Sequence, residues 1–163
     1  ALDWLQRLLT EPEPAGVLRA SPDHALATRP GAGVEGRLHG GNLALVAASC
    51  GTRDALSTRG RILLLEDVGE PAYRVDRMMV QLARSGLLAE VAGLAFGRFT
   101  GGADTESEAV DAVLRRWADT VGVPAVSGLP FGHVRDHWAL PLGCRAALVG
   151  GPDTLTILES AVV

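Results

Sequence analysis

Lysine is missing from the sequence altogether, since all 15 basic residues among its 163 are arginine. Without a lysine amine, the chain can perform neither Schiff-base catalysis nor the phosphate binding of a P-loop lysine. The arginines are scattered and the net charge is -4, so no basic stripe offers the surface that nucleic acid requires. The sequence therefore excludes both chemistries and argues against a nucleic-acid partner.

Cysteine and long apolar runs are also scarce. Cys50 and Cys144 are the two cysteines, and both stand among apolar residues, which favours buried reduced thiols over reactive ones. No apolar run approaches the roughly 20 residues of a membrane-spanning helix, and no signal-peptide pattern is present. We therefore predict a cytoplasmic protein with no membrane partner.

The apolar residues that are present alternate between strand and helix patterns. Continuous apolar runs at 62–65 and 91–96 predict strands buried on both faces. Apolar residues at helical spacing follow each run, at 71–86 and again at 110–121. Shorter runs at 17–18, 25–27, 34, 124–126 and 139–157 predict further strands. The prediction is an α/β domain with a small mixed sheet or barrel-like β layer and packed helices.

The folded domain is predicted to begin after residue 15. Leucines at helical spacing in residues 2–10 indicate a short helix, and the Glu-Pro-Glu-Pro that follows breaks it. Residues 1–15 are therefore predicted to be a lead-in helix and linker, and residues 16–163 the domain itself. Because the first residue is alanine and not methionine, we expect a longer parent polypeptide.

Two glycine-containing motifs are candidate ligand sites. Residues 31–36 match the G-x-G-x-x-G dinucleotide motif, but an Arg-Pro pair precedes it where a buried strand is needed, and no helix follows. We interpret these residues as turn glycines. Gly40, Gly41 and Asn42 open a predicted helix, whose backbone N–H groups suit a carboxylate or phosphate. An ordinary cap by Asn42 explains this motif equally well, so Gly41 and Asn42 are candidate substrate-binding residues only.

Histidines and acids form two further candidate sites. His133 and His137 with Asp136 resemble a metal-binding pair, but no third ligand stands at a recognised spacing. Glu66 ends a buried strand and His133 follows a later one, and ligands of α/β sheets bind at the carboxyl ends of strands. A carboxylate that accepts the Nδ1–H of an imidazole leaves Nε2 free to take a proton from a nucleophile. From spacing alone, a capping Glu66 and a structural His133 remain the better explanation.

Three separated motifs favour the catalytic interpretation of Glu66 and His133 over the structural one. They are GRLHGGNL at 36–43, ILLLEDVGEPAYRVDRM at 62–78, and GLPFGH at 128–133 with LPLG at 140–143. In order and spacing they resemble the C-terminal domain of the LD-carboxypeptidase (muramoyltetrapeptide carboxypeptidase) family, over residues 16–163. The resemblance implies a cytoplasmic, homodimeric serine peptidase without metal or other cofactor. Such an enzyme removes the terminal D-alanine from the L,D bond of murein tetrapeptides in cell-wall recycling.

The resemblance also assigns roles to residues. Glu66 takes the place of the family's catalytic glutamate and His133 that of its histidine, whereas Asp67 and Glu70 do not. The family's serine lies in a preceding N-terminal domain, and none of the serines of this chain stands in a nucleophile elbow. We therefore expect the nucleophile, and the oxyanion hole beside it, outside this sequence. The chain by itself is expected to be inactive.

Two other functions stay open. One is a non-catalytic ligand-binding or dimerisation domain, in which Gly40 to Asn42 hold a carboxylate and Glu66 is only a helix cap. The distance between the Glu66 carboxylate and the His133 imidazole separates this function from catalysis. The other is the immunity branch of the same family, which hydrolyses peptide-nucleotide antibiotics. Its members carry an aromatic-bearing insertion, and the span from 42 to 62 has no tryptophan.

Overall fold

The structure is a computed structural model that describes residues 1–21, 33–101, 104–149 and 153–163, with the side chains of 104–106 left out. Its helices are α1 (Leu2–Thr10), α2 (Leu43–Ser49), α3 (Ala72–Arg84) and α4 (Asp104–Val121). Its strands are β1 (Gly16–Arg19), β2 (Val34–Asn42), β3 (Arg61–Val68), β4 (Gly93–Thr100), β5 (Ala125–Val126), β6 (Arg145–Val149) and β7 (Thr154–Ile157). None of the helices in these ranges has both the length and the apolar character to cross a membrane.

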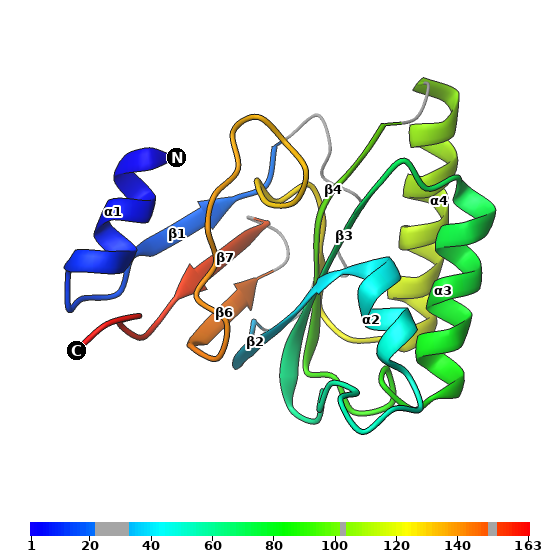
Figure 1. Cartoon of the computed structure of the whole chain (residues 1–163), viewed down its shortest axis with the longest axis horizontal. Helices are drawn as coiled ribbons and strands as arrows, with labels where there is room; N and C mark the ends of the chain where they lie inside the picture. The colour runs from blue at the N-terminus through cyan, green and yellow to red at the C-terminus, as the bar shows by residue number, and fades with distance from the viewer. Residues whose placement is uncertain (22–32, 102–103, 150–152) are drawn as a thin grey trace.

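The strands form one seven-stranded mixed sheet in the order β1-β7-β6-β2-β3-β4-β5. Strands β2 to β5 run parallel and are connected through α2, α3 and α4. Strands β6, β7 and β1 extend the sheet beyond β2 in antiparallel pairing. Figure 1 shows the three connecting helices together on one side of the sheet. The predicted α/β class with a mixed sheet is confirmed, while the predicted strand at 25–27 lies outside the described residues.

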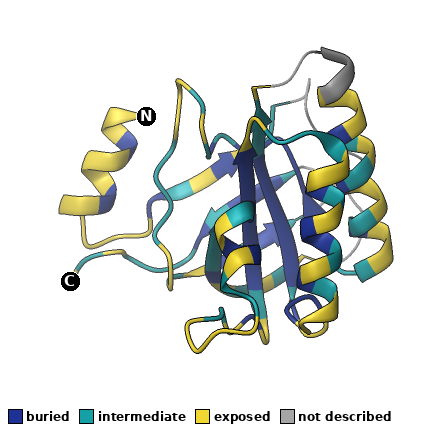
Figure 2. Cartoon of the chain, turned by 45° about the vertical axis from the view of Figure 1, so that its right-hand side comes forward, coloured by how far each residue is buried: buried dark blue, intermediate teal, exposed yellow. Residues whose placement is uncertain are grey.

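The apolar run of β3 is uninterrupted because both of its faces are buried. Leu63 and Leu65 pack in the core between the sheet and the helices, together with Val75 and Met79 of α3. Ile62 and Leu64 point into a second core on the opposite face. Each fully buried side chain of this size contributes roughly 1.5–3 kcal/mol relative to an exposed one. Figure 2 shows the result, with buried strands inside and helices exposed on their outer faces.

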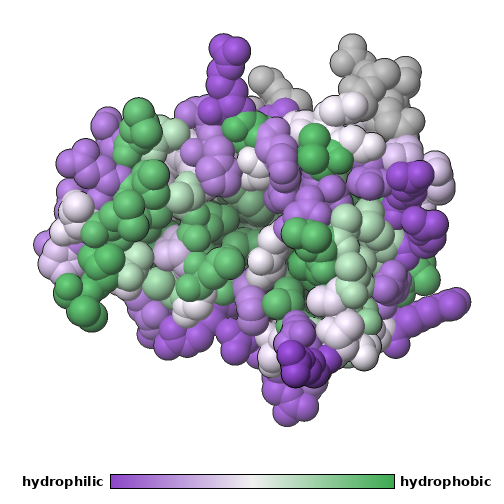
Figure 3. Space-filling view, in the orientation of Figure 1, coloured by the Kyte–Doolittle hydropathy of each residue, from purple (hydrophilic) through white to green (hydrophobic). Residues whose placement is uncertain are grey.

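The second core holds the long loop between β5 and β6 against the sheet. Trp4 of α1 donates its indole N–H to the Ala139 carbonyl at 2.7 Å, and its ring lies 4.9 Å from that of Trp138. Trp138 also donates its backbone N–H to the Pro130 carbonyl at 2.8 Å. The outer side of α1 leaves leucines exposed, and Figure 3 shows apolar side chains gathered over this helix. These contacts fix both ends of the loop segment that carries His133.

Strand β2 is longer than the sequence analysis predicted, because glycines serve in it as strand residues. The interpretation of Gly36 as a turn glycine is wrong, since Gly36 pairs within β2, and a Cβ there would lie 2.9 Å from the Gly60 carbonyl oxygen. Gly40 and Gly41 likewise end β2 instead of opening a helix. The predicted cap is confirmed, because the Asn42 side chain accepts the Leu45 N–H.

Candidate active site

Glu66 stands near the carboxyl end of β3, in the middle of the sheet. Its partner in the β2 register is Asn42, so it lies level with the point where β2 gives way to α2. Only 6% of Glu66 is exposed. Burying a carboxylate costs free energy unless hydrogen-bond donors reach it. Here the loop after β5 supplies those donors.

That loop reaches Glu66 because β4 is irregular at the same level. The register between β3 and β4 shifts beside Glu66, and Arg98 of β4 donates its backbone N–H to the Phe131 carbonyl at 2.9 Å. A Cβ on Gly97 would lie 2.5 Å from that carbonyl oxygen. The glycine thus allows the loop to approach the sheet this closely.

The carboxylate of Glu66 binds His133 twice. Its Oε2 accepts the His133 backbone N–H at 3.2 Å and lies 2.8 Å from Nδ1 of the imidazole. Because an ionised carboxylate only accepts hydrogen bonds, Nδ1 carries the proton and Nε2 holds the free lone pair. The His133 side chain is 55% exposed and that of Glu66 8%. The pair therefore combines a buried, orienting acid with an accessible basic nitrogen.

Glu66 also changes the proton affinity of the imidazole. The hydrogen bond to Glu66 comes first, and Coulombic attraction to the same carboxylate second, in raising the pKa of His133 above its usual 6.5. The positively charged ring is the form that a general base adopts after it accepts a proton from a nucleophile. The arrangement thus stabilises the product of the proton transfer that a serine hydrolase needs.

The second acid of the Leu-Glu-Asp sequence has a different task. Asp67 accepts the Ala44 backbone N–H at 3.0 Å and the Asn42 side-chain N–H at 2.9 Å, so it supports the start of α2. Glu70 lies 3.5 Å from the guanidinium of Arg74, one turn along α3. Neither acid is hydrogen-bonded to His133, whose carboxylate partner is Glu66.

A pocket of about 420 Å³ opens beside the pair. Glu66, His133 and His137 are its titratable lining residues, and the others are Gly40, Gly41, Leu64, Phe131, Gly132, Leu140 and Leu142. A Cβ on Gly40 would lie 2.0 Å from the Leu64 carbonyl oxygen. Glycine at this position therefore keeps β2 close to β3 along the pocket wall.

A family model for the LD-carboxypeptidase C-terminal domain matches residues 35–148. The chain belongs to the LD-carboxypeptidase family. The match runs from β2 to β6 and includes Glu66, the loop with His133 and every lining residue named for the pocket. The family predicted from the three sequence motifs is confirmed.

Curated relatives of this LD-carboxypeptidase domain carry related names. A putative carboxypeptidase of Synechocystis is 41% identical over 126 residues, which are 76% of this chain and 42% of that protein. The probable murein peptide carboxypeptidase of Bacillus subtilis is 35% identical over 131 residues, covering 78% and 41%. The murein tetrapeptide carboxypeptidase of Pseudomonas aeruginosa is 37% identical over 139 residues, covering 82% and 45%. The chain thus spans less than half the length of these relatives.

Solved structures show the same LD-carboxypeptidase fold. A muramoyltetrapeptide carboxypeptidase from Oxalobacter formigenes superposes with a TM-score of 0.81 at 35% identity, over 97% of this chain and 54% of that one. The microcin self-immunity protein MccF superposes with a TM-score of 0.80 at 21% identity, over 99% and 56%. At this identity, the likeness to MccF shows a shared fold and does not indicate the substrate of this chain.

The LD-carboxypeptidase domain brings together only some of the predicted site residues. Glu66 and His133 meet, and Gly41 lines the pocket. The amide of Asn42 is engaged by Asp67 and the Leu45 N–H, and Asn42 is not a lining residue. A substrate-binding role of Gly41 and Asn42 stays a prediction. The sequence analysis did not assign a role in this pocket to His137, although its closeness to His133 in the sequence could have suggested one.

The titration of His133 offers a first test of the pair. With Glu66→Gln in this 163-residue chain, we expect the His133 pKa to fall, because the hydrogen-bonded negative charge that raises it is gone. NMR of the imidazole C–H resonances against pH measures this change, and His39, bonded to the Ser57 carbonyl, serves as the unaffected reference. An unchanged His133 pKa in the variant would contradict the interpretation that Glu66 raises it.

The same shift implies a pH dependence of stability. Since the folded-state pKa of His133 is raised, its contribution to stability is fully present below the unfolded pKa and is lost as pH rises through the folded pKa. The free energies of unfolding in urea of the unmodified 163-residue chain and its Glu66→Gln variant should therefore differ most at mildly acidic pH, where the His133 imidazole is charged. If the difference in unfolding free energy grew as the pH rose through this range, it would contradict a raised His133 pKa in the folded chain.

Proposed function

We propose that this chain is the part of a serine-type LD-carboxypeptidase that supplies the catalytic base His133 and its orienting acid Glu66. The observation that carries the proposal is the 2.8 Å contact between Glu66 Oε2 and His133 Nδ1 at an open pocket. The names of the Bacillus subtilis and Pseudomonas aeruginosa relatives supply the substrate class, a murein peptide. The reaction is hydrolysis of the L,D-peptide bond that releases terminal D-alanine from murein tetrapeptides.

In this reaction a serine attacks the carbonyl carbon of the L,D bond. Nε2 of His133 takes the serine proton during the attack and then passes it to the nitrogen of the leaving D-alanine. Glu66 holds the ring in the tautomer that keeps Nε2 basic and stabilises the charged ring between the two transfers. Water then hydrolyses the acyl-enzyme, with His133 again acting as base. The proposal requires no metal or other cofactor.

The nucleophile is proposed to come from an N-terminal domain of the same polypeptide. No serine, threonine or cysteine is among the pocket-lining residues in the part of the chain that the structure describes. The matched relatives are more than twice as long as the regions that this chain covers. Both observations support a serine supplied by sequence outside these 163 residues.

Further properties of the parent enzyme follow from the same resemblance. We place it in the cytoplasm, where murein peptides are recycled, and expect it to be a homodimer. Within this chain, residues 1–15 would be the lead-in helix and linker to the N-terminal domain, and residues 16–163 the catalytic half. The division could be tested by the stability of a chain that begins at residue 16.

The decisive assay compares this chain with its full-length parent. We expect the parent to release D-alanine from tetrapeptides that end in L-lysyl-D-alanine or diaminopimelyl-D-alanine, and this chain to release none above background. A base without its nucleophile activates only water. Released D-alanine is measured with D-amino acid oxidase, and a tetrapeptide ending in L-alanine is the stereochemical control. Hydrolysis by this chain alone, or none by the parent, would refute the proposal.

The same assay separates the alternatives. A non-catalytic binding domain would bind the tetrapeptide in the parent protein without releasing D-alanine, and the Glu66–His133 hydrogen bond argues against it. A member of the immunity branch would prefer a peptidyl-nucleotide over the murein tetrapeptide. Running both substrates side by side therefore distinguishes the two activities of the family.

A further inference from the structure

The pocket must also accommodate the end of the peptide. A carboxypeptidase substrate ends in a free carboxylate, which loses free energy on leaving water unless a hydrogen-bond donor or a positive charge meets it. Among the described residues that line the pocket there is no arginine, and His133 and His137 are the basic side chains. His133 is committed to Glu66. Within this chain, His137 is therefore the lining side chain left to meet the carboxylate.

His137 is held in place through one nitrogen of its ring. Its Nδ1 lies 3.2 Å from the Gly132 N–H and 3.0 Å from the Gly132 carbonyl oxygen. The first contact suits a neutral ring protonated at Nε2, and the second suits a ring protonated at Nδ1, either neutral or charged. Nδ1 keeps a bond to Gly132 in every one of these forms, and a carboxylate beside Nε2 selects a form in which Nε2 carries a hydrogen.

Nε2 of His137 has no hydrogen-bond partner within the described ranges of the chain. The backbone on both sides of the ring is held by hydrogen bonds. The His133 N–H bonds to Glu66 on one side, and the Trp138 N–H bonds to the Pro130 carbonyl on the other. The ring is thus preorganised, with Nε2 as its unused nitrogen. Preorganisation lowers the entropy cost of binding a ligand group.

The position of His137 relative to His133 fits the geometry of the proposed substrate. The leaving nitrogen accepts its proton from His133, and the carboxylate carbon of the leaving amino acid stands two bonds from that nitrogen. A group that binds the carboxylate must therefore lie beside His133. His137 occupies the same loop and lines the same pocket.

We propose that His137 binds the terminal carboxylate of the peptide through Nε2–H and makes the enzyme specific for a free C-terminus. This inference rests on the proposed function and adds the residue that recognises the end of the substrate. His137 is a specificity residue in this scheme, since the proton transfers belong to His133.

The experiment uses the full-length parent enzyme and two tetrapeptides that differ only in a terminal D-alanine or D-alaninamide. We expect the wild-type enzyme to favour the free acid in kcat/KM by about ten- to a hundredfold, the value of a charge-assisted hydrogen bond. In His137→Gln and His137→Ala the preference should fall to near unity, mainly through a higher KM for the acid.

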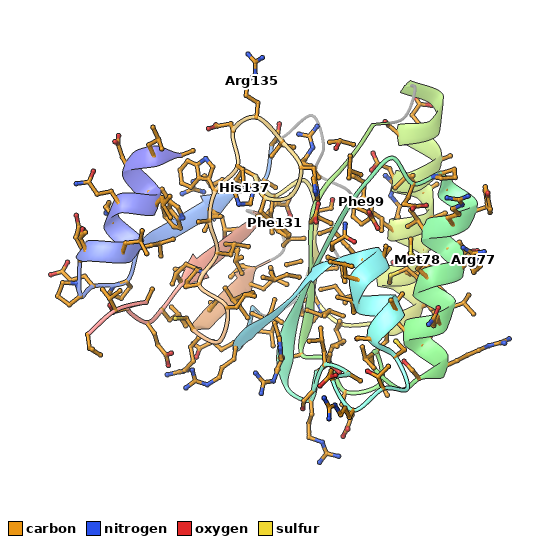
Figure 4. All side chains as sticks on the ribbon, in the orientation of Figure 1. Arg77, Met78, Phe99, Phe131, Arg135 and His137 are labelled. Carbon is orange, nitrogen blue, oxygen red and sulfur yellow. The ribbon has the colours of Figure 1, made fainter. Side chains whose placement is uncertain are left out.

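Arg135 provides the matched control, because it is a cation on the same loop. Figure 4 shows its side chain extending away from the molecule, at the outer tip of the loop that also carries His137. Arg135→Gln should keep the wild-type preference for the acid. General damage to the loop would lower kcat/KM for acid and amide equally and leave their ratio unchanged.

Three results are informative. A preference that collapses in both His137 variants and persists in Arg135→Gln supports the proposal. A preference that persists in the His137 variants overturns it, whatever happens to the absolute rates. Hydrolysis of neither peptide by the wild-type enzyme would instead refute the proposed function itself.

Discussion

Replacing Glu66 with glutamine in the full-length parent enzyme is expected to lower kcat by about three to four orders of magnitude. Glutamine keeps the shape of the side chain and can still accept the His133 backbone N–H that now bonds to Oε2. It removes the negative charge that fixes the proton on Nδ1 and stabilises the imidazolium. Because both effects act in the transition state, the loss should appear in kcat, with KM little changed. Steady-state release of D-alanine measures it.

Asp67→Asn is the matched control for this variant. It makes the same loss of charge at the next residue, but Asp67 is bonded to the start of α2 and not to His133. We expect it to lower the melting temperature, with kcat reduced by no more than about tenfold, since the reacting groups keep their positions. Near-normal turnover in Glu66→Gln, or equal losses of turnover in both variants, would contradict the role given to Glu66.

Much of the fold could be predicted because its central elements have simple patterns. The apolar run of β3 is continuous since both faces are buried, and the helical stripe of α3 faces a single core. Asn42 is an N-cap whose side chain accepts an N–H three residues on, which is a local interaction. Such features depend on neighbouring residues in the sequence, so sequence reasoning can find them.

The extent of β2 could not be predicted for a physical reason. Gly36 and Gly40 have low strand propensity and resemble turn residues. The structure nevertheless requires them, because the backbone of β3, or of Gly60 just before it, leaves no room for a Cβ. This requirement arises only after β2 and β3 are paired. Tertiary packing here overrides a local preference.

The candidate site, too, was predictable from the sequence only in part. Because Glu66 ends one strand and His133 follows another, both are expected at the carboxyl ends of the strands, and the family resemblance gave them roles. Spacing alone could not decide between a catalytic pair and a structural one. The hydrogen bond depends on the β4 irregularity at Gly97, which admits the loop. The part of His137 in the pocket depends in turn on that loop's conformation. Both are consequences of the folded structure.

The loop conformation leads to the last prediction, which concerns Gly132. Its φ is +105°, and a Cβ at this position would lie 2.7 Å from Glu66 Oε2 and 2.9 Å from Glu66 Cβ. Gly132→Ala should therefore displace Glu66 or the loop and break the contact between Oε2 and His133. We expect kcat of the parent enzyme to fall by about a hundredfold or more, the effect of a displacement of about 1 Å in an active site. The pKa of His133 should fall toward its usual value.

Gly143→Ala is the control that separates the clash of a Cβ with Glu66 from the strain of a positive φ. Gly143 has a φ of +87° and would present its Cβ to open space, so alanine should cost about 1–2 kcal/mol of stability from φ alone. Gly132→Ala should cost at least as much and also abolish most turnover, whereas Gly143→Ala should retain it. Urea unfolding, kcat and the His133 titration are measured on both variants. If Gly132→Ala kept its turnover and a raised His133 pKa, the close approach of the loop to Glu66 would not be what positions His133.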